Sequence, residues 1–148
     1  MFIGTYEHSL DQKGRVSMPG RFREVLGAEQ QVVIATNLDP GCRCLVVYPL
    51  PEWRAFVDRL DAGADLDQNA IRLNRLVMAS AALCPIDRQG RVLIPATLRE
   101  YAGLSRDLLW AGIGRKCELW DKARFATEHE RARVELPDIT RALAERKG

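Results

Sequence analysis

The sequence predicts an α+β fold, mainly β, in which a small unit of strand, strand, short helix, strand and strand occurs twice. Residues 11–24 read DQKGRVSMPGRFRE and residues 87–100 read DRQGRVLIPATLRE, so Asp, Gly-Arg-Val, Pro and Arg-Glu recur 76 positions apart. The same succession of turn, strand and helix signals surrounds both copies. A repeat at a fixed offset predicts that one structural unit is used twice.

Each unit begins with a strand near residue 5 or 80, followed by a tight turn. Asp11 and Asp87 hold the first position of this turn, and Gly14 and Gly90 hold the fourth. Asp can bond the backbone at such a turn, and Gly tolerates a positive φ. The turn therefore predicts the tip of a hairpin whose second strand is Arg15–Met18 or Arg91–Ile94.

A proline marks the change from strand to helix in both units. Pro19 and Pro95 lack the N–H that a strand ladder needs but suit the first turn of a helix, and Gly27 and Gly103 stand where these helices should close. Two further strands complete each unit. They are expected at 31–36 with 44–48, and at 107–111 with 117–120.

Charged, helix-prone segments follow each unit. Pro51 should open a helix with Trp53, Phe56 and Val57 on one apolar stripe, and Gly63 should separate it from a second helix at about 68–80. The expected division of the chain is 5–51 for the first unit, 52–79 for a helical linker, 80–123 for the second unit and 124–148 for a C-terminal helical tail.

The tail should contain two helices. Residues 122–133 are charged and helix-prone, Pro137 interrupts them, and Asp138 is placed to cap a last short helix.

Composition limits the functions that are open to this chain. It has 148 residues and a net charge of +2, so binding to nucleic acid would need locally concentrated charge or several copies acting together. No run of about 18 apolar residues could cross a membrane, and Glu7 and Asp11 stand where a secretion signal would need its apolar stretch. A cytosolic protein with no membrane partner is expected.

Catalytic and metal-binding patterns are weak. The two histidines, His8 and His129, lie near no recognisable nucleophile, and no phosphate-cradling glycine motif occurs, so neither an enzyme nor a cofactor is expected. Cys42 and Cys44, or the equivalent repeat positions His8 and Cys84, could hold a metal. Buried, reduced thiols are the favoured interpretation of all four cysteines, so no metal site is predicted.

Basic residues are concentrated at the two turns. A guanidinium presented from a turn can bond a phosphate or the O6/N7 edge of guanine. The alternative is that Asp11 pairs with Arg15, and Asp87 with Arg91, only to brace the turns, and bracing is also compatible with binding. The candidates for DNA contact are Arg15 first, Lys13 and Arg91 next, then Arg88, Arg21, Arg23 and Arg99, with Asp11, Gly14, Asp87 and Gly90 bracing the motif.

The duplicated D-x-x-G-R-V-x-x-P-x-x-x-R-E words and the opening MFIGTYEHSLD closely resemble the MraZ family, over nearly the whole chain. The paired D-x-x-x-R motif is that family's signature, and it is present as Asp11 with Arg15 and Asp87 with Arg91. The resemblance implies two SpoVT/AbrB-like units fused into one small barrel with a pseudo-twofold axis. Such a fusion would make an otherwise intermolecular pairing intramolecular.

The resemblance also implies a function. Members of the family are sequence-specific DNA-binding transcriptional regulators, usually repressors of their own cell-division and cell-wall gene cluster, associated with cytoplasm and nucleoid. They form rings, from which binding to short direct repeats of double-stranded DNA is expected, with the helices at Trp53–Val57 and Ile71–Met78 free for contacts between subunits. A protein-interaction scaffold on the same antitoxin-like fold, without DNA, is the alternative, and no small-molecule substrate is expected.

Overall fold

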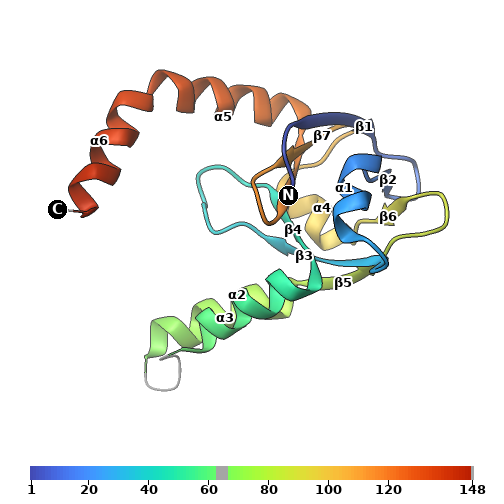
Figure 1. Cartoon of the computed structure of the whole chain (residues 1–148), viewed down its shortest axis with the longest axis horizontal. Coiled ribbons are helices and arrows are strands. Elements are labelled where there is room, and N and C mark those ends of the chain that lie inside the picture. The colour runs from blue at the N-terminus through green and yellow to red at the C-terminus, as the bar shows by residue number, and fades with distance from the viewer. Residues whose placement is uncertain (63–66, 148) are drawn as a thin grey trace.

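The computed structural model describes residues 1–62 and 67–147, which form an antiparallel six-stranded sheet, a separate two-stranded ribbon and six helices (Figure 1). The strand order of the sheet is β1-β7-β8-β4-β3-β5, and the ribbon pairs β2 with β6. The strands are β1 (Thr5–Ser9), β2 (Arg15–Ser17), β3 (Gln31–Thr36), β4 (Leu45–Tyr48), β5 (Ala82–Pro85), β6 (Arg91–Leu93), β7 (Asp107–Gly112) and β8 (Cys117–Asp121). The helices are α1 (Gly20–Leu26), α2 (Leu50–Asp61), α3 (Gln68–Ser80), α4 (Ala96–Ala102), α5 (Lys122–Val134) and α6 (Leu136–Lys147).

The first two strands of each half pair with the other half, so the predicted local hairpins are wrong. β1 pairs with β7, β5 pairs with β3, and β2 pairs with β6, all antiparallel. Among the strands of the described residues, only the pairs β3 with β4 and β7 with β8 lie within one half, as predicted, and β4 with β8 joins the halves at the centre of the sheet. Because both halves offer the same strand edges, each can be satisfied by its counterpart in the other copy.

The expected small barrel is not closed. β1 and β5 lie at the two edges of the six-stranded sheet and are not bonded to each other, and the ribbon forms a second sheet. The strand order nevertheless reads the same from either end when each strand is exchanged for its repeat counterpart. The two copies of the repeat are therefore interlocked, because both sheets contain strands from both copies.

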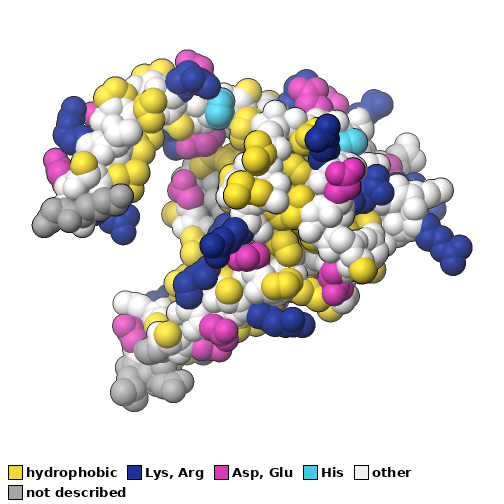
Figure 2. Space-filling model, viewed as in Figure 1, with side chains coloured by type: hydrophobic (Ala, Val, Ile, Leu, Met, Phe, Trp, Pro, Cys, Tyr) yellow, Lys and Arg dark blue, Asp and Glu magenta, His cyan; other side chains and the backbone are white. Residues whose placement is uncertain are grey.

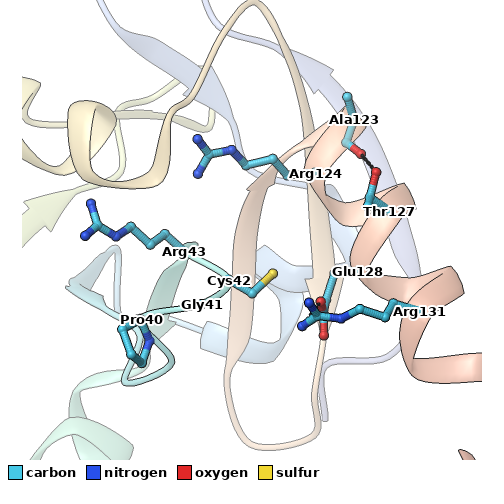
Figure 3. Close-up of a pocket in the computed structure, with 9 residues that line it drawn as sticks. All are labelled: Pro40, Gly41, Cys42, Arg43, Ala123, Arg124, Thr127, Glu128 and Arg131. Atoms are coloured by element: carbon cyan, nitrogen blue, oxygen red, sulfur yellow. Dashed lines mark hydrogen bonds and ion pairs between the residues drawn. The ribbon is translucent and has the colours of Figure 1, made fainter. Parts of the chain in front are cut away.

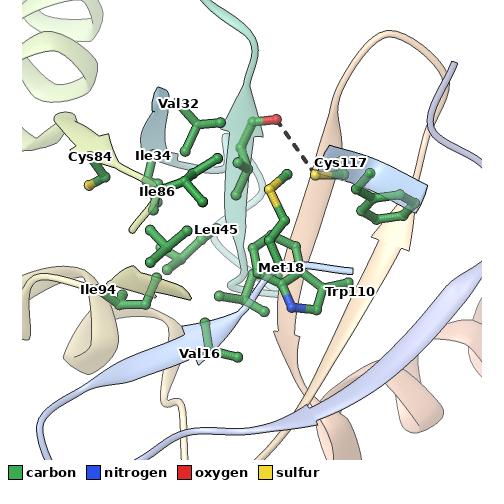
Figure 4. Close-up of a cluster of buried hydrophobic side chains, with 14 of the residues drawn as sticks. Val16, Met18, Val32, Ile34, Leu45, Cys84, Ile86, Ile94, Trp110 and Cys117 are labelled. Atoms are coloured by element: carbon green, nitrogen blue, oxygen red, sulfur yellow. Dashed lines mark hydrogen bonds between the residues drawn. The ribbon is translucent and has the colours of Figure 1, made fainter. Parts of the chain in front are cut away.

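The main core lies between one face of the large sheet, the ribbon, and helices α1 and α4 (Figure 4). Side chains alternate along β3, where Val32 and Ile34 enter this core and Val33 enters a separate cluster on the opposite face. Trp110 of β7 is fully buried, and its indole N–H donates to the Ser17 carbonyl at 3.0 Å. This bond joins the second half's sheet strand to the first half's ribbon strand.

The opposite face of the sheet is covered by α2 and α5. Trp53 and Phe56 of α2 pack on Tyr48 with ring centroids 5.1 and 5.4 Å away, and Phe125 of α5 packs on Trp120 at 5.6 Å. Trp53 and Phe56 of the predicted stripe are thus partly buried against the protein's own sheet, and Val57 is half-buried. Within α3, by contrast, Val77 is buried while Ile71, Leu73, Leu76 and Met78 remain exposed.

Several local predictions are settled by the backbone. Gly27 and Gly103 close α1 and α4 with φ of 64° and 60°, as predicted. α6 begins at Leu136, so Asp138 lies in its first turn and does not cap it. Gly63 falls outside the described residues. None of the helices in residues 1–62 and 67–147 is long and apolar enough to span a bilayer.

The crossed pairing predicts that neither half folds alone. A fragment of residues 1–60 keeps β1 and β2 but lacks β7 and β6, their hydrogen-bond partners, and much of the core. We expect it to be unfolded, or to associate with a second copy through the surface of the missing half. Light scattering and NMR would check this, and a monomeric fragment with a dispersed spectrum would contradict it.

Candidate nucleic-acid interface

The first turn is organised by the carboxylate of Asp11. Oδ1 accepts the backbone N–H groups of Lys13 and Arg15 at 2.9 Å each, and Oδ2 accepts Arg15 Nε at 2.8 Å. The Gly14 N–H closes the turn on the Asp11 carbonyl at 3.1 Å, with φ of 86° at the glycine. Both oxygens of one side chain therefore fix the backbone of the turn and the direction of the arginine.

The second turn repeats this arrangement. Asp87 Oδ1 accepts the N–H groups of Gln89 and Arg91 at 2.9 Å each, and Oδ2 accepts Arg91 Nε at 3.2 Å. Gly90 has φ of 81° and donates to the Asp87 carbonyl at 2.9 Å. The predicted tight turns and the predicted Asp–Arg pairs are thus both confirmed.

The ribbon presents the two braced arginines on one face. In the β2–β6 register Arg15 faces Leu93, and Arg91 faces Ser17. Facing residues of an antiparallel pair project to the same side, and residues two apart on a strand do so as well. Val16 and Val92, on the other side, are 1% and 0% exposed, so Arg15 and Arg91 lie on the outer face.

Two of the remaining predicted residues, Lys13 and Arg88, stand in the two turns, and a third, Arg21, lies in α1. Lys13, Arg88 and Arg21 are exposed, and none of them forms an ion pair with another described residue. Figure 2 shows Lys and Arg side chains projecting at the end of the molecule where the ribbon lies. Lys13 and Arg88 therefore add exposed positive charge to the two turns, beside the arginines that pair with Asp11 and Asp87.

Arg23 and Arg99 lie in different surroundings from the other arginines that are predicted to contact DNA. Both are half-buried, and their Nε groups donate to backbone carbonyls, Arg23 to Met18 at 3.2 Å and Arg99 to Ile94 at 3.0 Å. Each lies against the turn glycine of the opposite half. Sequence reasoning missed this contact because it joins residues of different copies, although the regular spacing of Gly and Arg in the repeat carried the signal.

The hydrogen bonds at the turns lower the pKa of both aspartates below the ordinary 3.8. The largest cause is the bond from the backbone N–H of Arg15 for Asp11, and from that of Arg91 for Asp87. These bonds favour the charged carboxylate. Both turns are therefore braced by ionised carboxylates at neutral pH.

A cavity of about 560 Å³ lies away from the ribbon, between the β3–β4 loop and α5 (Figure 3). Three arginines line it: Arg131 pairs with Glu128 at 2.7 Å, Arg43 lies 5.0 Å above the ring of Tyr101, and Arg124 forms no ion pair with another described residue. Burial raises the pKa of the Cys42 thiol to about 11, so it stays protonated at neutral pH. The described lining of this cavity therefore offers no activated nucleophile.

The predicted preference for core cysteines is largely confirmed. Cys44, Cys84 and Cys117 are buried and free, whereas Cys42 is half-buried. His8 and Cys84, the equivalent positions considered for a metal, lie on β1 and β5 at opposite edges of the sheet. In the described part of the chain no three His, Cys, Asp or Glu side chains gather to hold an ion.

The pKa directions predict how the turns respond to acid. A carboxyl group whose pKa is lower in the folded state stabilises the fold above its unfolded pKa of about 3.9, and this contribution is lost as the pH falls through the folded pKa. We expect the side-chain carboxyl ¹³C shifts of Asp11 and Asp87 to titrate below the ordinary value of 3.8. The amide shifts of Lys13 and Arg15 should follow Asp11, and Asp11→Asn should abolish this dependence. Titration at or above the ordinary value would contradict the bracing.

The comparison with known proteins agrees with the repeated architecture. The family model for the MraZ protein, described as antitoxin-like, matches the chain twice, over residues 1–75 and 77–147. Three similar relatives each carry the name Transcriptional regulator MraZ. That of Lachnoclostridium phytofermentans is 43% identical over 125 residues, 84% of each chain. That of Thermomicrobium roseum is 36% identical over 97% of this chain and 98% of its own. That of Halorhodospira halophila is 40% identical over 97% of this chain and 99% of its own.

The two matches of the family model together cover almost every residue, and the relatives cover most of both chains at more than 30% identity. The chain therefore belongs to the MraZ family.

Proposed function

We propose that this protein is a transcriptional regulator that binds double-stranded DNA through the outer face of the β2–β6 ribbon and its two turns. The observation that carries the proposal is the placement of Arg15 and Arg91, each braced by an aspartate, on one outer face. The name of the relatives, Transcriptional regulator MraZ, supports the regulatory role. No catalytic activity is part of this proposal.

The bracing favours recognition of bases. Within each guanidinium only Nε bonds to the aspartate, so the terminal amino groups of Arg15 and Arg91 remain available for the O6/N7 edge of guanine or for a phosphate. A fixed arginine loses less side-chain entropy when DNA arrives. A two-stranded ribbon also fits the major groove, which is about 12 Å wide.

The other exposed residues have distinct roles in this proposal. Lys13, Arg88 and Arg21 supply phosphate contacts, which add affinity without sequence preference. Leu93, 56% exposed on the same ribbon face, can contact a thymine methyl group.

The regulatory setting that we propose is the one that the resemblance to the family implies. The protein acts in the cytoplasm, on the nucleoid, as a repressor of its own cell-division and cell-wall gene cluster, and it binds short direct repeats as a ring. Two SpoVT/AbrB-like units, 5–51 and 80–123, related by a pseudo-twofold axis, form the DNA-binding body, with 52–79 as the helical linker and 124–148 as the tail. A ring is favoured because a net charge of +2 gives one subunit little hold on a short site, whereas repetition raises the effective concentration of each further turn.

The role of Arg15 can be tested by mutation. If it reads a guanine edge, Arg15→Ala should weaken binding to the protein's own upstream DNA by about 1–3 kcal/mol and relax the preference at one base. Arg54→Ala, which removes an exposed arginine on α2 away from the ribbon, is the matched control. Fluorescence anisotropy with matched and scrambled duplexes measures both effects. A folded Arg15→Ala protein with unchanged binding would overturn the assignment, and a wild-type protein that retards no upstream DNA would favour the scaffold.

The direct-repeat arrangement predicts a phase dependence. Subunits around a ring meet one side of a duplex only if sites recur about every 10–10.5 base pairs. Three repeats in phase should therefore bind much more tightly than the same repeats separated by a further half turn, about five base pairs. Equal affinity for the two DNAs would show that the subunits bind independently.

A further inference from the structure

We infer that Arg23 and Arg99 are positioning residues, each of which holds the DNA-reading turn that belongs to the other half of the chain. The inference rests on the proposed function, since it names what aligns that same site. Arg99 in α4 holds the turn that carries Arg15, and Arg23 in α1 holds the turn that carries Arg91.

The first support is the contact between guanidinium and glycine. A Cβ built on Gly14 would lie 2.9 Å from Arg99 Cζ, and one built on Gly90 would lie 2.7 Å from Arg23 Cζ. Real Cβ atoms do not approach other heavy atoms so closely, so only glycine lets the guanidinium rest there. Both glycines are buried, although most of the other residues in the two turns are exposed.

The second support is the hydrogen bonding around each contact. The Gly14 carbonyl accepts the Ile94 N–H at 2.9 Å, and the Ile94 carbonyl in turn accepts Arg99 Nε at 3.0 Å. One residue of the second half, Ile94, is therefore bonded both to the first half's turn and to the arginine that covers it.

The other half repeats the arrangement. The Gly90 carbonyl accepts the Met18 N–H at 2.8 Å, and the Met18 carbonyl accepts Arg23 Nε at 3.2 Å. The same construction thus occurs twice, with the halves exchanged.

Each turn is consequently held from two sides. Its own aspartate fixes the arginine that follows, and the opposite half's arginine fixes the glycine immediately before that arginine. Reading a base edge needs its side chain held within a fraction of an ångström, whereas attraction to phosphates tolerates displacement. Loss of the positioning arginine should therefore reduce discrimination between sequences and leave nonspecific affinity unchanged.

A direct phosphate contact by Arg23 and Arg99 makes a different forecast. Replacing a phosphate-binding cation weakens binding to all sequences alike and lowers the salt slope by about one, while lysine, which keeps the charge, largely preserves the contact. Lysine cannot reproduce a planar guanidinium lying over the glycine with its Nε on a carbonyl. Arg99→Lys and Arg99→Gln together therefore separate positioning from charge.

The experiment measures affinity of the full chain for its own upstream DNA and for a scrambled duplex over a range of salt concentrations. For both Arg99→Lys and Arg99→Gln we expect the ratio of the two affinities to fall roughly tenfold, with the scrambled affinity and its salt slope as in wild type. Wild-type behaviour of Arg99→Lys, or a lower salt slope in Arg99→Gln with an unchanged ratio, would overturn the inference. Loss of folded protein alone would lower both affinities equally and leave their ratio intact, which also counts against positioning.

A second readout needs no DNA. Hydrogen exchange in Arg99→Lys should accelerate in peptides that cover 11–17 and not in those that cover 87–91, and Arg23→Lys should show the reverse. Faster exchange only in the mutated half would overturn the inference. If wild type fails to discriminate between the two DNAs while these crossed effects appear, the proposed function fails and the positioning stands.

Discussion

The pairing of strands between the two halves is the interaction on which the rest of this protein depends. β1, β2 and β5 find their ladder partners only in the opposite copy, so their backbone groups are satisfied only when both copies are present. The same crossing closes the main core, because Trp110 of the second half bonds Ser17 of the first. A single unit would leave strand edges and an apolar face exposed to water. Because this chain contains two copies of the unit, each copy covers these surfaces of the other without a second molecule.

The crossing also determines the shape of the candidate site. Because β2 and β6 pair directly, the arginines that follow the two turns lie on one surface, although they are 76 positions apart in the chain. The aspartates act locally, through bonds within five residues, while the arginines of α1 and α4 act across the halves. Each turn glycine is thus held both by the aspartate of its own turn and by the arginine of the opposite half. The exposed Lys and Arg side chains of the turns are not used in these contacts.

Much of this could be predicted from the sequence, where the signal was local. The Asp-x-x-Gly motifs predicted the turns, the prolines and glycines predicted the limits of the short helices, and the alternation of apolar residues predicted the strands. Which strands pair with each other could not be predicted from the sequence, because both copies contain strands with the same edges. Only the packing of the whole core decides whether a strand pairs within its own copy or with the other copy. For the same reason the sequence could not reveal that Arg23 and Arg99 lie against the turn glycines of the opposite halves. It also left Trp53 and Phe56 as a free surface, whereas in the structure they pack on the protein's own sheet.

We propose that both turns of the interlocked halves meet DNA together. Hydrogen exchange of the full chain, with and without duplex DNA from its own upstream region, tests this most directly. We expect DNA to slow exchange in peptides covering both 11–17 and 87–93, with little change in α2 and α3. Protection confined to one turn, or centred on α3 while the ribbon exchanges as before, would contradict it.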